Sequence, residues 1–191
     1  MKKKKLIFQS FLILLIFTNN CLADLQKDLI NKLTATKTLS FNFKQIIEEK
    51  EETGKCFIKY PMLMKCDYQN LKQKSIISNG RTVAIIKKKY KKIYLYPIGK
   101  TQLSTILKKE KILALIRNSK PSITKTNTIK YEFIDKKSNK LQMFFDKNSL
   151  ELKGWETTDA YSNNVIFEIN NIKVNEIIDD EFFTIPKEED L

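Results

Sequence analysis

Residues 54–66 read GKCFIKYPMLMKC, two short strand-like segments on either side of Pro61. Cys56 and Cys66 are equidistant from that proline, so folding back at Pro61 would place them opposite one another on one face of a β-hairpin. Directly paired positions are close enough for a disulfide, whereas the spacing excludes a C-x-x-C redox motif. The stretch therefore predicts an antiparallel hairpin with a Cys56–Cys66 disulfide, and two small buried thiols are the alternative.

Further strands are predicted on both sides of this hairpin. Residues 39–47 alternate with the period of a half-buried strand, and the charged residues 48–52 with Gly54 predict a loop and a turn. Asn79-Gly80 is a strong hairpin-turn signal between two apolar segments. The remaining predicted strands are residues 74–78, 82–87, 90–96 (ending at Pro97), 129–134, 141–146, 150–155 and 165–169.

Helical periodicity is confined to two regions. Residues 24–37 carry apolar side chains at helical spacing and predict one amphipathic helix. Residues 103–116 show the same spacing, interrupted by Lys108–Lys111, and predict two short helices before Pro121. These helices are too few for βαβ units. The predicted fold class is mainly β (α+β), a single curved antiparallel sheet with helices on one side.

The N-terminus has the pattern of a cleaved signal peptide. Lys2–Lys5 precede the apolar run 6–17, and Cys21-Leu22-Ala23 forms a small-residue exit. The run is too short to span a ~30 Å hydrocarbon core comfortably; an uncleaved anchor is the alternative. We therefore expect a signal peptide over residues 1–23 and a single exported domain over residues 24–191. Export to an oxidising compartment favours a disulfide over a metal site for the remaining cysteines.

The composition excludes several classes of function. The 191 residues include 35 Lys plus Arg, 22 Asp plus Glu and no His, so a Ser-His-Asp triad and a His-ligated zinc are excluded. Only Arg81 and Arg117 are arginines, and a basic excess made of Lys is poorly suited to base readout. The carboxylate groups Glu156 with Asp159, and 179–181, lie among turn residues without an apolar setting. We expect no enzyme activity, cofactor, metal or nucleic-acid partner.

Two lysine clusters have no role in the predicted fold or in the functions considered above. They are Lys87–Lys89 with Lys91-Lys92, and Lys108-Lys109 with Lys111. Such clusters are usually solvated turns, and the alternative is attraction to anionic lipid headgroups or an acidic partner surface.

The chain beyond the signal resembles the periplasmic outer-membrane lipoprotein carrier protein family, LolA. Matching segments occur in the family's order from the first helix to the C-terminus. They are Leu39-Ser40-Phe41 with Phe43-Lys44-Gln45; Gly54 through Tyr60-Pro61 to Asp67-Tyr68; Ser78-Asn79-Gly80-Arg81-Thr82-Val83; Tyr94 to Pro97 followed by the Thr101 to Leu107 helix; Leu152-Lys153-Gly154-Trp155 with Asp159; and Asp180-Glu181-Phe182-Phe183-Thr184-Ile185.

The resemblance implies an incomplete β-barrel with helices as a lid over a hydrophobic cavity. It also implies a monomeric periplasmic carrier that takes acylated lipoproteins from an inner-membrane ABC transporter to an outer-membrane receptor. An outer-membrane lipoprotein receptor or an envelope lipid-sensing module of the same fold are the alternatives. One departure concerns the Arg-Pro step of the family's first hairpin, where this chain has Tyr60-Pro61. Lid opening through that arginine therefore does not carry over, although the Tyr60 hydroxyl could donate to a lid carbonyl.

Strand parity within this fold gives an expected acyl-chain site. The predicted cavity wall is Phe43, Ile58, Tyr60, Met64, Ile93 and Leu95, with Leu107, Leu113 and Leu115 on the lid helices and Cys56 with Cys66 as the disulfide. Structural core is the competing interpretation for each of these residues, and Trp155 is expected to be structural.

Overall fold

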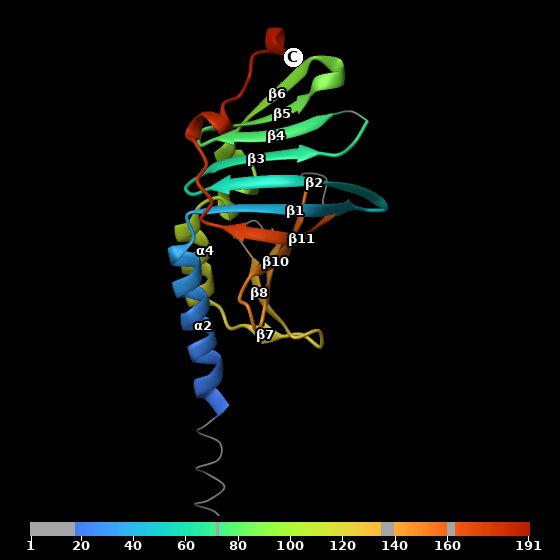
Figure 1. The fold of residues 1–191 in the computed structure, drawn as a ribbon. Coiled ribbons are helices and arrows are strands. Elements are labelled where there is room, and N and C mark those ends of the chain that lie inside the picture. The colour runs from blue at the N-terminus through green and yellow to red at the C-terminus, as the bar shows by residue number, and fades with distance from the viewer. Residues whose placement is uncertain (1–17, 72, 135–139, 160–162) are drawn as a thin grey trace, which may run out of the picture.

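The chain is organised around one large β-sheet. The computed structural model describes residues 18–191 except 72, 135–139 and 160–162. In this part of the chain, eleven antiparallel strands follow the order β6-β5-β4-β3-β2-β1-β11-β10-β9-β8-β7, so that β6 and β7 are its edges (Figure 1). The predicted single antiparallel sheet is confirmed, and it is not closed into a barrel. Most of the predicted signal peptide, residues 1–17, lies outside the described residues.

The strands form two meanders with two of the helices between them. The first meander is β1 (Thr38–Ile47), β2 (Lys50–Lys59), β3 (Leu63–Tyr68), β4 (Lys74–Asn79), β5 (Thr82–Lys87) and β6 (Lys92–Pro97). The second is β7 (Ser122–Ile123), β8 (Thr128–Ile134), β9 (Lys140–Asp146), β10 (Leu152–Thr158) and β11 (Asn164–Val174). The helices are α2 (Thr18–Ala35), α3 (Leu103–Ile106) and α4 (Lys109–Asn118), with 3₁₀ turns η1 (Lys88–Tyr90), η2 (Ile98–Lys100), η3 (Asp180–Phe183) and η4 (Glu188–Asp190).

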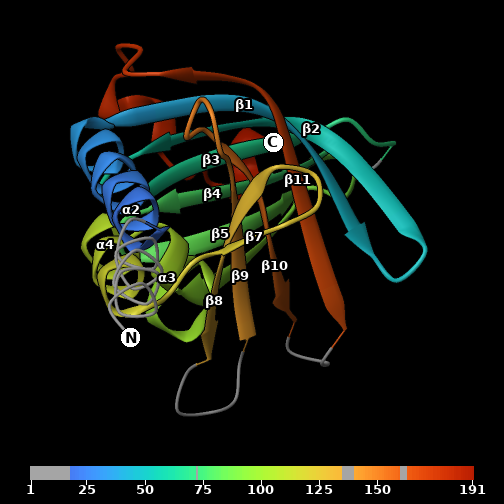
Figure 2. The same ribbon diagram turned by 90° about the horizontal axis from the view of Figure 1, so that it is seen from below.

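The sheet is strongly curved, and the helices lie on its concave side. Figure 2 shows β1–β6 crossing over β8–β11, with α2, α3 and α4 gathered at one end of the space between them. Leu29 of α2 and Ile116 of α4 are fully buried in the same core as the concave side chains of the sheet. The predicted pair of short helices is confirmed, whereas α2 begins at Thr18, before the expected start at Asp24.

The β2–β3 hairpin has the predicted register. Cys56 pairs directly with Cys66 and the two are joined in a disulfide, with Tyr60-Pro61, a cis peptide, at the turn. Both cysteines are buried on the concave face. A row of directly paired residues continues this face across the strands: Phe41, Cys56, Cys66, Ile76, Ile85 and Tyr94.

The loop predicted over residues 48–52 is largely strand. The chain turns at Glu48 and Glu49, and β2 starts at Lys50, so that Gly54 lies inside the strand. This end of the β1–β2 hairpin carries charged side chains, including an ion pair of Lys44 with Glu51 at 3.5 Å, in place of the apolar alternation that marks a half-buried strand. Elsewhere, Tyr90 belongs to a 3₁₀ turn, and β10 and β11 extend to Thr158 and Val174.

Gly54 is required by the packing of the concave face. It pairs with Phe43 and Tyr68, and a Cβ at this position would lie 2.7 Å from Phe43 Cζ and 2.2 Å from the Asp67 carbonyl oxygen. Separations this short force the ring or the backbone of β3 to move. Glycine thus allows the Phe43 ring to lie over β2.

We predict that Gly54→Ala destabilises the fold by about 1–3 kcal/mol, because the added methyl overpacks against Phe43 and β3. Chemical denaturation followed by circular dichroism measures the change. Gly99→Ala is the matched control, since a Cβ there has no atom within 4 Å. Equal free energies of unfolding for the two variants would contradict this packing.

The disulfide closes a loop within the hairpin, since its cysteines are ten residues apart in sequence. We predict that Cys56→Ala with Cys66→Ala lowers the free energy of unfolding by about 2–4 kcal/mol, because the unfolded chain gains conformational freedom. Urea denaturation of both proteins measures the difference. If the unmutated protein, denatured without a reducing agent, has two free thiols, the disulfide does not form.

Candidate functional site

A cavity of about 860 Å³ lies between the concave face of the sheet and the segment that carries α3. Its first wall comes from β1 to β6, its second from β10 and β11, and its third from Gly99 to Ile106. The main apolar lining residues are Phe41, Met64, Ile76, Val83, Ile85, Tyr96, Leu103, Ile106, Trp155, Val165 and Phe167, together with the disulfide. The two meanders are distant in sequence, and the curvature of the sheet makes them face each other across the cavity.

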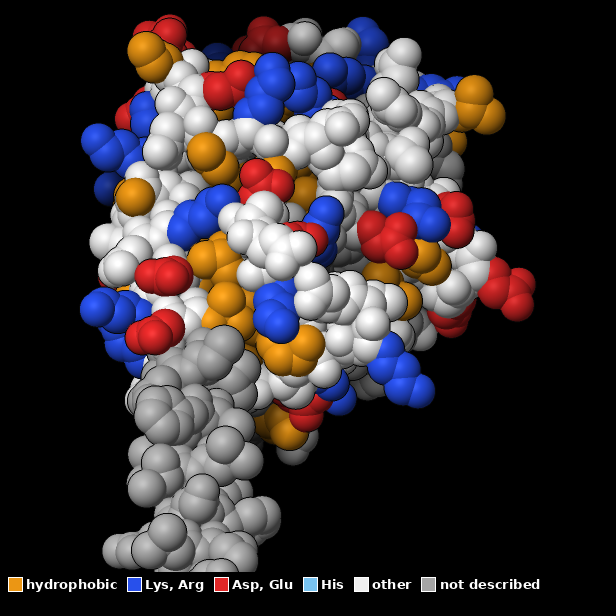
Figure 3. All heavy atoms as spheres, turned by 60° about the horizontal axis from the view of Figure 1, so that its bottom comes forward, with side chains coloured by type: hydrophobic (Ala, Val, Ile, Leu, Met, Phe, Trp, Pro, Cys, Tyr) orange, Lys and Arg blue, Asp and Glu red, His pale blue; other side chains and the backbone are white. Residues whose placement is uncertain are grey.

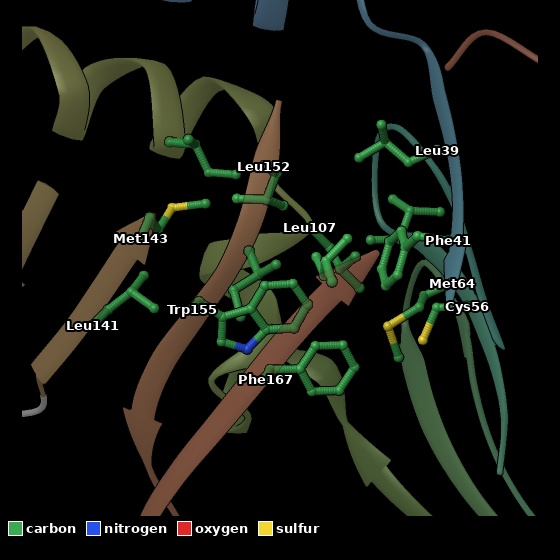
Figure 4. Close-up of a cluster of buried hydrophobic side chains, with 14 of the residues drawn as sticks. Leu39, Phe41, Cys56, Met64, Leu107, Leu141, Met143, Leu152, Trp155 and Phe167 are labelled. Atoms are coloured by element: carbon green, nitrogen blue, oxygen red, sulfur yellow. The ribbon is translucent and has the colours of Figure 1, made fainter. Parts of the chain in front are cut away.

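The two sheet walls carry apolar side chains that point toward one another. Figure 4 shows Leu39, Phe41, Cys56 and Met64 on β1–β3 facing Leu141, Met143, Leu152, Trp155 and Phe167 on β9–β11, with Leu107 between them. All ten are buried. Part of this set lines the cavity and the rest packs beside it, so the apolar core and the cavity wall form one continuous surface.

An aromatic row crosses the junction of the two meanders. The Trp155 and Phe167 rings stack with centroids 4.3 Å apart, and Phe167 stacks on Phe43 at 4.7 Å. Phe43 in turn meets Tyr68 edge to face at 4.8 Å. Aromatic pairs in these arrangements contribute energy beyond the area they bury. The row therefore gives this part of the cavity a rigid wall.

Polar side chains line the cavity in two places, at the end of β10 and on the segment that carries α3. The Tyr68 hydroxyl donates to Gln45 Oε1 at 2.8 Å, and burial, with a smaller contribution from Glu52, raises the pKa of Tyr68. The phenol therefore remains protonated and keeps its hydrogen bond at physiological pH. Thr157, Thr158 and Asp159 line the cavity from the end of β10, while Lys100 and Lys111 contribute from the helical side. The cavity thus combines apolar sheet walls with polar groups at the end of β10 and on the helical side.

The helices are tied to the sheet and to each other by named contacts. The Met62 amide in the β2–β3 turn donates to the Leu107 carbonyl at 3.0 Å. Lys109 Nζ donates to the Thr34 and Thr36 carbonyls, both at 2.9 Å, at the C-terminal end of α2. A cation at this end of a helix is favoured by the helix dipole. These bonds hold α4 against α2 and the hairpin.

Tyr60 contacts this region through its ring. Lys109 Nζ lies 5.7 Å from the centre of the Tyr60 ring, within cation–π distance. Burial raises the pKa of the Tyr60 phenol. The contact with α4 thus differs from the hydroxyl-to-carbonyl bond that the sequence suggested.

The structure brings most of the nine predicted site residues to one side of the sheet. Met64 lines the cavity; Phe43, Ile58 and Leu107 are buried in the core cluster beside it; and Tyr60 and Leu115 pack against that cluster. Leu113 is buried on α4.

Ile93 and Leu95 lie on the opposite, convex face. They pair with Ile86 and Ala84, whereas Tyr94 and Tyr96 pair with the cavity-lining residues Ile85 and Val83. Both faces of this part of the sheet bury apolar groups, because Ile185 and Leu191 from the C-terminal segment pack on the convex side with Ile77, Ala84, Ile86 and Ile93. Alternation alone therefore does not tell which residues of β6 face inward.

Several cavity residues were missed from the sequence. Phe41 is two positions from the predicted Phe43 and shares its face, so strand parity could have found it. Trp155, expected to be structural, both packs in the core and lines the cavity, as does Phe167. Trp155 and Phe167 face Phe41 only because β11 pairs with β1. These two strands lie far apart in the sequence.

The described residues hold no group of three or more His, Cys, Asp or Glu side chains that could bind a metal ion. Among the carboxylates, Asp159 accepts hydrogen bonds from the Asn163 backbone and side-chain nitrogens, both at 2.9 Å. This carboxylate therefore links the end of β10 to Asn163, the residue before β11.

The outer surface mixes charge and apolar groups. Figure 3 shows apolar side chains gathered near the middle of one face, between Lys, Arg, Asp and Glu side chains. Within the ranges that the structure covers, no helix is long and apolar enough to cross a membrane.

Comparison with known proteins gives the family. No curated protein matches this sequence. An uncharacterized conserved protein from Thermus thermophilus is similar in structure, with a TM-score of 0.53 and 8% identity over 86% of this chain and 94% of that chain. A LolA superfamily protein from Nitrosomonas europaea has a TM-score of 0.43 and 9% identity, covering 83% of this chain and 97% of that one.

The MucA/MucB complex from Pseudomonas aeruginosa gives a TM-score of 0.48 and 10% identity, covering 86% of this chain and 62% of that one. Among families, residues 34–186 match the outer membrane lipoprotein carrier protein LolA. This match spans most of the sequence, from the end of α2 through η3. The chain therefore belongs to the LolA family.

Proposed function

We propose that the cavity binds the acyl chains of lipoproteins and that the protein carries them through the periplasm. In this role it receives lipoproteins from an ABC transporter in the inner membrane and passes them to a receptor at the outer membrane. The observation that carries the proposal is the apolar cavity of about 860 Å³ between the two sheet walls. Membership of the LolA family supports it.

The physical need for such a carrier follows from acyl-chain hydration. Exposing some tens of methylenes to water costs on the order of 30 kcal/mol at ~0.8 kcal/mol each. A wall of Phe41, Met64 and Trp155 offers apolar contact without directional bonds, so it can shield chains of different lengths. No bond is made or broken in this task, which requires neither a catalytic group nor a cofactor.

The polar groups of the cavity suit the head of an acylated molecule. Gln45, with its Tyr68 hydrogen bond, and Thr157 of β10 line the cavity with polar groups. Lys100 and Lys111 lie on the helical side of the same cavity. We infer that the acyl chains lie among the aromatic residues and that the attached glyceryl and peptide groups lie beside these polar groups.

We infer that a guest enters when the helices move away from the sheet. The bonds from Met62 to Leu107 and from Lys109 to the end of α2 would then open together, because both hold the segment between α3 and α4. The neutral backbone bond contributes about 0.5–1.5 kcal/mol, and a bond from the charged Lys109 about 1.5–3 kcal/mol. Binding of apolar chains can offset losses of this size.

We predict that a brominated fatty acid quenches the fluorescence of Trp155, the single tryptophan of the chain, in a saturable manner. The heavy atoms would lie against the indole, because Trp155 lines the cavity. The unbrominated fatty acid is the control and should leave the emission largely unquenched. A folded protein that shows no saturable quenching would contradict acyl-chain binding in this cavity.

Neighbouring residues of β6 offer a matched test of which face binds. We predict that Tyr96→Glu weakens fatty-acid binding about tenfold or more, because the carboxylate would be desolvated beside the chain. Leu95→Glu places the same charge on the convex face and should bind as the parent does. Fluorescence titration measures both affinities, and a larger loss in Leu95→Glu would refute the assignment.

A further inference from the structure

The end of β5, the turn after it and the edge strand β6 carry exposed aromatic and basic side chains, of which Tyr96 alone lines the cavity. Four of the nine exposed large hydrophobic side chains of the described residues lie here: Tyr90 (52% exposed), Tyr94 (45%) and Tyr96 (44%), with Leu95 (61%) on the opposite, convex face of β6. Five lysines accompany them: Lys87, Lys88, Lys89, Lys91 and Lys92. We call the three tyrosines and five lysines the β6 patch; β6 lies at the end of the sheet near the C-terminus (Figure 1).

The positive charge of the β6 patch is only partly balanced. Glu188 lies 3.8 Å from Lys92 Nζ, and Glu189, which follows it in η4, pairs with Lys187 instead. Lys88, Lys89 and Lys91 are exposed, and Lys87 Nζ lies over the Tyr94 ring at 5.2 Å from its centre. The patch therefore presents an excess of positive charge beside aromatic rings.

The open edge of β6 is poorly suited to adding another strand. The outward amide of Ile93 already donates to Glu188 Oε1 at 3.0 Å, and Pro97, which ends the strand, has no amide hydrogen. Lysines on an edge strand also discourage pairing between edges. Protection of the edge accounts for the lysines but gives no reason for three exposed tyrosines.

We propose that the β6 patch docks the protein on a lipid bilayer that contains anionic headgroups. Tyrosine rings favour the interface, where the ring meets apolar groups and the hydroxyl meets water. Clustered lysines are attracted to an anionic surface without a shaped pocket. This combination fits a lipid surface better than a protein partner, whose binding depends on anchors buried in pockets.

The β6 patch lies next to the cavity. Tyr96 belongs both to the β6 patch and to the cavity lining, and Lys100, three residues after Pro97, lines the cavity as well. Docking through the patch thus brings one wall of the cavity to the bilayer surface. Docking through the β6 patch does not depend on whether the cavity binds acyl chains.

Co-flotation with vesicles tests the proposal. The protein is expressed with its own N-terminal segment, purified from the water-soluble fraction, and mixed with vesicles of phosphatidylcholine alone or with added phosphatidylglycerol. We expect binding only to the anionic vesicles, with release at high salt. Replacing Lys88, Lys89, Lys91 and Lys92 by Gln should weaken binding by about 600-fold, since each lysine near an anionic surface contributes roughly fivefold.

The matched control removes the same charge elsewhere, by replacing the exposed Lys27, Lys37, Lys120 and Lys125 by Gln. It should retain most of the vesicle binding, and thermal unfolding should show both variants folded. Tyr90→Ser with Tyr94→Ser keeps the lysines and should weaken binding several-fold. Equal binding to both vesicle types, equal loss in the control, or full binding by the tyrosine variant would overturn the proposal.

Discussion

The pairing of β1 with β11 is the contact on which the rest of the structure depends. It joins the two meanders, whose paired residues, such as Gln45 and Phe167, come from distant parts of the chain. Across this seam, the Phe43, Phe167 and Trp155 rings form a continuous stack. Because the sheet curves there without closing, its concave face would be open to water unless helices or a guest covered it. Every feature of the candidate site follows from that geometry.

The apolar side chains on the two faces of the first meander are covered in different ways. On the convex side, the C-terminal segment covers the sheet: Phe182 meets Phe57 edge to face, and Ile185 and Leu191 pack on β4 to β6. On the concave side, α2 and α4 cover one end, and the rest is the cavity. The chain thus provides its own cover for one face and leaves part of the other as the cavity, which the proposed guest would fill.

Local features of the sequence predicted much of the fold. The symmetry of Cys56 and Cys66 about Pro61 predicted the register of β2 and β3 because a hairpin is a short-range structure. The charged end of the β1–β2 hairpin was less accessible, since cross-strand ion pairs replace the apolar alternation there. Helix–sheet contacts such as that of Met62 with Leu107 depend on tertiary packing that no local pattern encodes.

The candidate site was only partly predictable for the same reason. Met64 was found from strand parity, but Trp155 and Phe167 enter the cavity only once β11 pairs with β1. Ile93 and Leu95 show the converse limit, because a strand with apolar groups on both faces has no unique inward parity.

The most direct test of the central claim is native mass spectrometry of the protein released from spheroplasts that are exporting lipoproteins. If the cavity binds acyl chains, we expect a complex whose mass equals the chain plus an acylated lipoprotein. We also expect this complex to dissociate when the acyl chains are removed enzymatically. Recovery of the folded chain without acylated cargo, while the same cells release lipoproteins from the inner membrane, would contradict the claim.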